Sequence, residues 1–149
     1  MTHWTIRVPL VAVLVLASAC GSSTPTGPTP PPAPANIAGR WTGNLISSNY
    51  AAQAFSMQTS QSSASVSGTW VVSPNDWNGT ITGTTDPSSF TGTITISAPN
   101  ALGVGARCTG TASVSGPASS AATLRWTSPG FTGSCTGMPT GLVLNLQRQ

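Results

Sequence analysis

The chain has no lysine and no glutamate, and its single histidine, His3, stands near the start. Catalytic serine and cysteine arrangements need a general base, and zinc sites need histidines or spare thiols, so this inventory argues against both. Only 5% of the residues are charged, which argues against the clustered basic stripe of a nucleic-acid-binding protein. We therefore expect no enzyme, no metal, no cofactor and no nucleic-acid partner. The charges after the first 19 residues are Arg40, Arg107, Arg125, Arg148, Asp76 and Asp86.

The two aspartates are the remaining candidates for acid–base chemistry. Asp76 and Asp86 flank one expected strand, and an extended chain at ~3.3 Å per residue places them about 30 Å apart. The paired carboxylates of glycosidases lie only about 5–9.5 Å apart. We therefore expect both aspartates in turns and not in a catalytic pair.

The first 19 residues form an expected signal peptide, with the apolar run VPLVAVLVLASA. This run is too short for a spanning helix, which needs about 20 residues. The boundary LASAC, from Leu16 to Cys20, resembles the lipobox of bacterial lipoproteins, although Ala17 stands where that family prefers leucine. The resemblance implies acylation of Cys20 and anchoring in the bacterial cell envelope, with Gly21 indicating the outer membrane. The alternative is an ordinary secretory signal that is cleaved near Ala19.

Residues 20–35 are expected to form a linker behind the lipidated cysteine. Six prolines stand among serine, threonine, glycine and alanine, a composition that cannot build a core and favours extended polyproline geometry. At ~3.1 Å per residue such a segment reaches roughly 45 Å. It would hold a folded domain, residues 36–149, away from the membrane.

The domain alternates apolar and polar residues with a period of two. FTGTITIS places Phe90, Gly92, Ile94 and Ile96 on one face, and LVLNLQR does the same with three leucines. This alternation, with single prolines between the stretches, is typical of antiparallel strands with one face in water. We predict eight strands, at residues 38–47, 53–60, 64–72, 78–84, 90–97, 106–115, 122–128 and 141–148.

Eight antiparallel strands must bury one face and protect their edges, and closure into a barrel achieves both. We therefore predict an all-β fold, a single antiparallel eight-stranded up-and-down β-barrel, with a β-sandwich as the alternative. Glycines recur on the apparent inner face, where they permit strong coiling of the strands and make room for Trp41, Trp70 and Trp126. These glycines are Gly43, Gly68, Gly83, Gly92 and Gly110.

The segment IAGRWTG opens the domain, and its Gly39-Arg40-Trp41 resembles the G-x-W of the first strand in calycins, the lipocalin and avidin superfamily. The resemblance implies that Trp41 plugs one end of the barrel. It also implies that an arginine late in the chain, here Arg125, covers that tryptophan.

Three cysteines remain to be assigned. If Cys20 carries lipid, Cys108 and Cys135 are left as a pair in an oxidising compartment, where a disulfide is the default. This bond would tie the sixth expected strand to the segment before the last one.

The expected function is binding without catalysis. Trp77 stands in an expected turn beside Asp76, and Tyr50 lies near the first hairpin, so these three are the candidate ligand-binding residues. The first hypothesis is a membrane-tethered barrel whose open end takes a small apolar or glycan ligand. The second is a structural or protein-interaction lipoprotein, for example an inhibitor of a secreted hydrolase, which predicts a filled interior and an exposed apolar patch.

Overall fold

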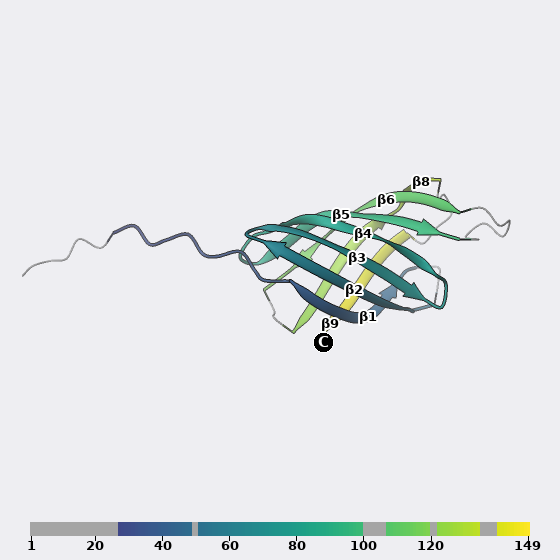
Figure 1. Ribbon diagram of the computed structural model, residues 1–149, viewed down its shortest axis with the longest axis horizontal. Coiled ribbons are helices and arrows are strands. Elements are labelled where there is room, and N and C mark those ends of the chain that lie inside the picture. The colour runs from purple at the N-terminus through teal and green to yellow at the C-terminus, as the bar shows by residue number, and fades with distance from the viewer. Residues whose placement is uncertain (1–26, 49–50, 100–106, 120–121, 135–139) are drawn as a thin grey trace, which may run out of the picture. The chain divides into compact units, whose positions relative to one another are not determined.

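The computed structural model of the protein describes residues 27–48, 51–99, 107–119, 122–134 and 140–149 (Figure 1). The chain divides into two units, residues 1–30 and 31–149, and every described strand lies in the second. In the first unit, residues 27–30 form neither helix nor strand. The expected signal peptide, Cys20, Tyr50 and Cys135 lie outside the described residues, so the predictions on them stay predictions. The described residues contain no helix with the length and apolar character needed to span a membrane.

The described strands form one antiparallel sheet, and none of the described residues is helical. Eight strands correspond to the eight predicted ones, with ends that differ by two residues at most, and the short β8 has no predicted counterpart. The strands are β1 (Gly39–Ile46), β2 (Gln53–Ser62), β3 (Ser65–Ser73), β4 (Trp77–Thr85), β5 (Ser89–Ala98), β6 (Cys108–Pro117), β7 (Thr123–Gly130), β8 (Thr132–Gly133) and β9 (Thr140–Arg148).

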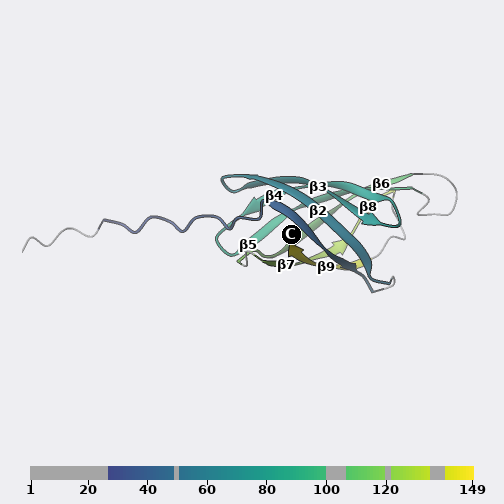
Figure 2. The ribbon, with the colours of Figure 1, turned by 60° about the horizontal axis from the view of Figure 1, so that its bottom comes forward.

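The sheet closes on itself. Its order is β5-β4-β3-β2-β1-β9-β7-β6-β8, and β5 also pairs with β6 from Ser89 opposite Pro117 to Ala98 opposite Cys108. Figure 2 shows β7 and β9 on the side of the barrel opposite β3 and β4. The predicted eight-stranded up-and-down barrel is therefore confirmed over the sandwich, and its closure removes the long open edges that invite aggregation.

The extra strand β8 continues β7 along β6 after a bulge. Ser115 pairs with Thr127, whereas Thr111 pairs with Thr132, so the chain opposite β6 holds one additional residue. Such an insertion is a β-bulge, and Gly130 at this point has a φ of 130° that only glycine adopts readily. The bulge lets Phe131 pack on the interior, with its ring centroid 6.4 Å from that of Trp70.

The inward positions form one continuous core. The alternating residues of β5 and β9 are buried as the sequence pattern predicts, and the threonines or amides between them reach solvent. The large side chains that are almost completely buried include three tryptophans and one phenylalanine, Trp41, Trp70, Trp126 and Phe90. The barrel interior is thus filled by side chains.

Glycines make room for the aromatic rings. Phe90 and Trp126 stack with their ring centroids 4.4 Å apart. Gly83 and Gly92 pair with each other across β4 and β5, and a Cβ on either would lie 2.7 or 2.6 Å from the Phe90 ring. A Cβ on Gly116 would lie 2.8 Å from Cδ1 of Trp126, although this glycine is not among those that the sequence pattern singled out. Any larger residue at these positions would force the strands apart.

At Gly79 a tryptophan side chain takes the place of a backbone hydrogen bond between β4 and β5. The Trp70 indole N–H donates to the carbonyl oxygen of Thr95 at 3.1 Å, across β4. A Cβ on Gly79 would lie 1.8 Å from that oxygen, so only glycine leaves the path open. The N–H of Thr80 donates instead to the Thr95 hydroxyl at 2.9 Å, so this donor keeps a partner at the break.

One end of the barrel, named here the Asp86 end, is closed by the chain that leads into β1. Ile37 is completely buried there, and its N–H donates to Oε1 of Gln61 at 2.9 Å. The Trp41 indole N–H donates to the Ile37 carbonyl at 3.0 Å, and the Ala35 N–H donates to the Asp86 carbonyl at 2.9 Å. Residues 35–38 and Trp41 therefore plug this end.

The arginine that covers Trp41 is Arg148, whose guanidinium carbon lies 4.7 Å from the ring centroid. Arg148 pairs with Trp41 in the β1–β9 register. The prediction of Arg125 in this place is wrong, because Arg125 alternates with the buried Leu124 and Trp126 and so lies on the exposed outer face of β7. On the last strand the side chains of Leu142, Leu144 and Leu146 face inward, and the same alternation directs the side chain of Arg148 inward.

The filled interior predicts a large penalty for removing one ring. Phe90→Ala should lower the free energy of unfolding by about 3–5 kcal/mol, because it leaves a cavity against Trp126 and two glycines that cannot fill it. Its exposed neighbour offers the control, since Thr91→Ser should change stability by no more than about 0.5 kcal/mol. Urea denaturation followed by tryptophan fluorescence measures both, and equal small effects would contradict the packing argument.

Candidate functional site

The opposite end of the barrel, named here the Asp76 end, carries a hollow of about 900 Å³. Its volume lies toward the upper part of the range for small-molecule sites, about 300–1,000 Å³. The β1–β2 loop, the β3–β4 turn and the residue after β5 line it. The lining residues are Ala51, Ala52, Gln53, Ala54, Ser73, Pro74, Asn75, Asp76, Trp77 and Pro99.

The polar groups of this hollow are held in place by short contacts. Asn75 Nδ2 donates to Oε1 of Gln53 at 2.7 Å, and Nε2 of the same glutamine donates to the Ala51 carbonyl at 2.9 Å. The turn brings Asp76 to a φ of 55°, a left-handed conformation that aspartate and asparagine tolerate better than most residues. Among the described residues no donor bonds the exposed Asp76 carboxylate, so its oxygens face solvent at the rim.

The three residues predicted to bind ligand have different outcomes. Asp76 lines the hollow as an exposed turn residue. Trp77 lines it too, but it begins β4, is inward-facing and is only 7% exposed, so it offers little ring surface to a ligand. The predicted strand began one residue later, which is why Trp77 was expected in a turn. Tyr50 lies outside the described residues.

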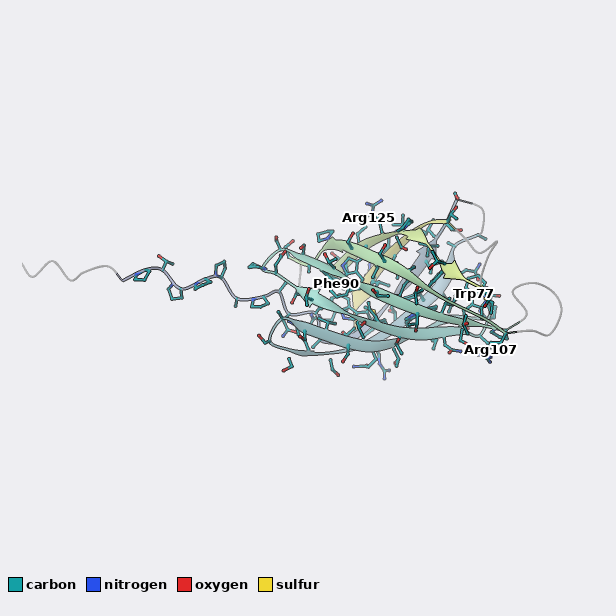
Figure 3. All side chains as sticks on the ribbon, turned by 90° about the horizontal axis from the view of Figure 1, so that it is seen from above. Trp77, Phe90, Arg107 and Arg125 are labelled. Atoms are coloured by element: carbon teal, nitrogen blue, oxygen red, sulfur yellow. The ribbon has the colours of Figure 1, made fainter. Side chains whose placement is uncertain are left out.

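The same end carries one of the domain's four arginines. Arg107 is exposed just before β6, and its Nη1 donates to the Ser97 hydroxyl at 2.7 Å. Figure 3 shows Arg107 and Trp77 toward one end of the barrel and Phe90 toward the other. The Asp76 end therefore combines a carboxylate, amides, a guanidinium and a partly apolar hollow, while the Asp86 end is plugged.

Asp86 has a structural environment. Its carboxylate accepts from the Ser89 hydroxyl at 2.6 Å and from the backbone N–H groups of Ser88 and Ser89 at 2.8 and 2.7 Å. These hydrogen bonds, the Ser89 hydroxyl first, lower the pKa of Asp86 from its ordinary 3.8 to about 2. The side chain thereby fixes the β4–β5 turn, and its acceptors are already engaged.

Cys108 begins β6 with only 3% of its surface exposed. Its predicted disulfide partner, Cys135, follows Ser134 directly in the chain. Ser134 bonds the residue beside Cys108, since its N–H donates to the Thr109 carbonyl at 2.9 Å and its hydroxyl accepts from the Thr109 N–H at 2.8 Å. These contacts join Thr109 and Ser134, which are the chain neighbours of the two cysteines, and the disulfide itself stays a prediction.

The described ranges hold no group of three or more histidine, cysteine or carboxylate side chains that would bind a metal ion. Comparison of the chain with protein-family models, with curated proteins and with solved structures finds no match. The case for a function therefore stands on the residues themselves.

The Asp86 turn predicts acid sensitivity with a definite window. Because its folded-state pKa is lowered, the carboxylate stabilises the fold at neutral pH, and this contribution is lost as the pH falls from about 4 through about 2. The melting temperature of the protein should fall more steeply over this window than that of Asp86→Asn. Ser89→Ala removes the largest cause of the shift, so its loss of stability over this window should be smaller in total and complete at a higher pH. Parallel curves for all three proteins would contradict the assignment.

Proposed function

We propose that the protein is a non-catalytic cell-envelope lipoprotein that binds a small neutral glycan at the Asp76 end. The observation that carries this proposal is the hollow of about 900 Å³ at that end, outside an interior filled by side chains. Ligand sites of this kind combine apolar surface with a small number of fixed polar groups. The Asp86 end offers no equivalent, because residues 35–38 occupy it.

The lining favours a glycan over a purely apolar ligand. Alanines, prolines and the small exposed part of Trp77 would supply apolar contacts for the C–H faces of sugar rings. The Asp76 carboxylate, with its oxygens toward solvent, would accept hydrogen bonds from sugar hydroxyls, and charge-assisted bonds of this type are the stronger ones. Asn75 and Gln53 add amide donors and acceptors at the same rim.

The membrane tether is part of the same proposal. Acylated Cys20 would anchor the chain, and the proline-rich residues 21–35 would act as a spacer of roughly 45 Å at full extension. Two or more acyl chains give stable anchoring where one is reversible. The barrel would then be held at the cell envelope, at the outer membrane by the sorting that Gly21 implies.

A second candidate is a protein-interaction lipoprotein. It is favoured by the filled interior and by two exposed apolar side chains, Ile46 and Val71, with exposed fractions of 38% and 47%. Both stand near the Asp76 end of their strands, on β1 and β3. Ile46 pairs with the half-buried Val143 of β9, whereas Val71 pairs with Ser56 and Asn78 on β2 and β4. The two exposed side chains therefore form no joint apolar patch, and the hollow carries more weight.

The glycan proposal is tested with a pair of identical substitutions at the two ends. Chitotriose and maltotriose are titrated into the isotope-labelled chain from residue 21, which contains every described strand. NMR shifts are expected at Gln53, Asn75 and Asp76. Asp76→Asn should weaken the binding about tenfold because it removes a charged acceptor, while Asp86→Asn should leave it unchanged. The absence of shifts at millimolar sugar would reject neutral glycans and favour the interaction candidate.

The tether has its own test. In a bacterial host that makes lipoproteins, the protein should partition into the detergent phase and incorporate labelled palmitate. Cys20→Ser should abolish both properties, because no thiol then accepts the diacylglycerol. Cys108→Ser serves as the matched control and should retain the lipid. A Cys20→Ser protein that still carries label would contradict the lipobox assignment.

A further inference from the structure

The outer wall of the barrel has two chemically different sides. From β3 to β6 the outward positions are almost all serine or threonine. On β1, β9 and β7 the outward positions include amides and arginine instead: Asn44 on β1, Asn145 and Gln147 on β9, and Arg125 on β7. Figure 3 shows Arg125 on the outer side of the barrel.

The amide-bearing side contains a groove of about 360 Å³, named here the amide groove. Its polar lining is Thr42, Asn44, Asn145, Gln147 and Thr123, and Gly43 with two buried leucines lies among them. The groove spans three adjacent strands, β1, β9 and β7, and does not include any residue of the hollow at the Asp76 end.

Strand register aligns these side chains in two neighbouring rows. Asn44 pairs with Asn145, and Asn145 pairs with Arg125 on the other side. In the next row Gln147 stands between Thr42 and Thr123. With strands about 4.8 Å apart and alternate residues about 7 Å apart, the two rows cover an area of about 10 by 7 Å.

The amide side chains of this groove and the neighbouring Arg125 keep their hydrogen-bonding capacity. Among the described residues, no hydrogen bond or ion pair engages the side chains of Asn44, Asn145, Gln147 or Arg125. The two aspartates of the domain lie in turns at the barrel ends, Asp76 between β3 and β4 and Asp86 between β4 and β5. Neither aspartate therefore neutralises the charge of Arg125 on the outer face of β7.

We propose that the amide groove is a second binding site, for a saccharide that carries a carboxylate. The guanidinium of Arg125 is planar and matches a carboxylate through two parallel hydrogen bonds. Each of the three amides offers both donors and an acceptor, the combination that a ring of hydroxyl groups requires. A site with one arginine and many neutral groups suits a uronic acid better than a phosphate, which would call for more cations.

The site goes beyond the proposed function, because it lies on different strands and takes a charged ligand. Its test uses trigalacturonic acid as the probe and the methyl ester of the same trisaccharide as the uncharged comparison. The acid is expected to shift the backbone amide signals of residues 42–44, 123–125 and 145–147 in the chain from residue 21. Signals of Gln53 and Asn75 report the other site separately.

Two arginine variants make the experiment specific. Arg125→Gln should weaken binding of the acid about tenfold and leave binding of the ester unchanged, because it removes only the charged pair. Arg125 adjoins the groove because it pairs with the lining residue Asn145, whereas Arg40 pairs with Gln58 of β2. Arg40→Gln therefore removes the same charge without an amide of the groove beside it and should change neither. Asn145→Ala should weaken both ligands, and urea denaturation checks that each variant is folded.

Four results would overturn the proposal. Absence of shifts at millimolar acid would exclude the site. Equal losses in Arg125→Gln and Arg40→Gln would reduce the effect to diffuse charge attraction. An equal response to inorganic phosphate would replace the saccharide by a bare anion. Shifts confined to Gln53, Asn75 and Asp76 would leave the proposed function standing and remove the second site.

Discussion

The structure depends on a steric match between aromatic rings and glycines inside a narrow barrel. Phe90 and Trp126 stack at 4.4 Å, and the strands opposite them approach only because Gly83, Gly92 and Gly116 have no side chain. Eight strands enclose a space just wide enough for side chains, so every ring must be matched by an empty position. Glycines also allow the strong coiling by which the sheet closes, with Gly92 and Gly116 where β5 meets β6 and Gly43 where β1 meets β9.

A filled interior decides where function can reside. Lipocalin-like barrels of this strand number hold a ligand inside when the interior leaves room for it. Here Trp41, Trp70 and Trp126 occupy that space, and Ile37 closes the Asp86 end. The binding that we propose is therefore left to the loops of the Asp76 end and to the outer wall. The tether would matter for the same reason, since a barrel without an internal ligand acts through the surface that it presents.

The alternation of apolar and polar residues was sufficient to predict the eight main strands and their inward faces, because the buried face of a strand depends on the residues within that strand. It could not decide between barrel and sandwich, since that depends on the pairing of β1 with β9 and of β5 with β6 across the closed sheet. The alternation did not predict β8, because this strand depends on the bulge at Gly130. Beyond the bulge, Thr132 and Gly133 pair again with β6.

The candidate sites were predicted less well. The errors concern which side chains of a strand face inward, and the alternation along each strand would have corrected them. Trp77 was placed in a turn because the expected strand began one residue late, yet it continues the inward set of Ile81 on β4. The calycin resemblance assigns Arg125 to cover Trp41, although its apolar neighbours Leu124 and Trp126 require it to face outward. That outward position is what leaves its guanidinium unpaired beside Asn145. In a chain with so few charged residues, the face of the strand decides the use of each one. An outward arginine such as Arg125 is open to a ligand, whereas an inward one such as Arg148 covers a core ring.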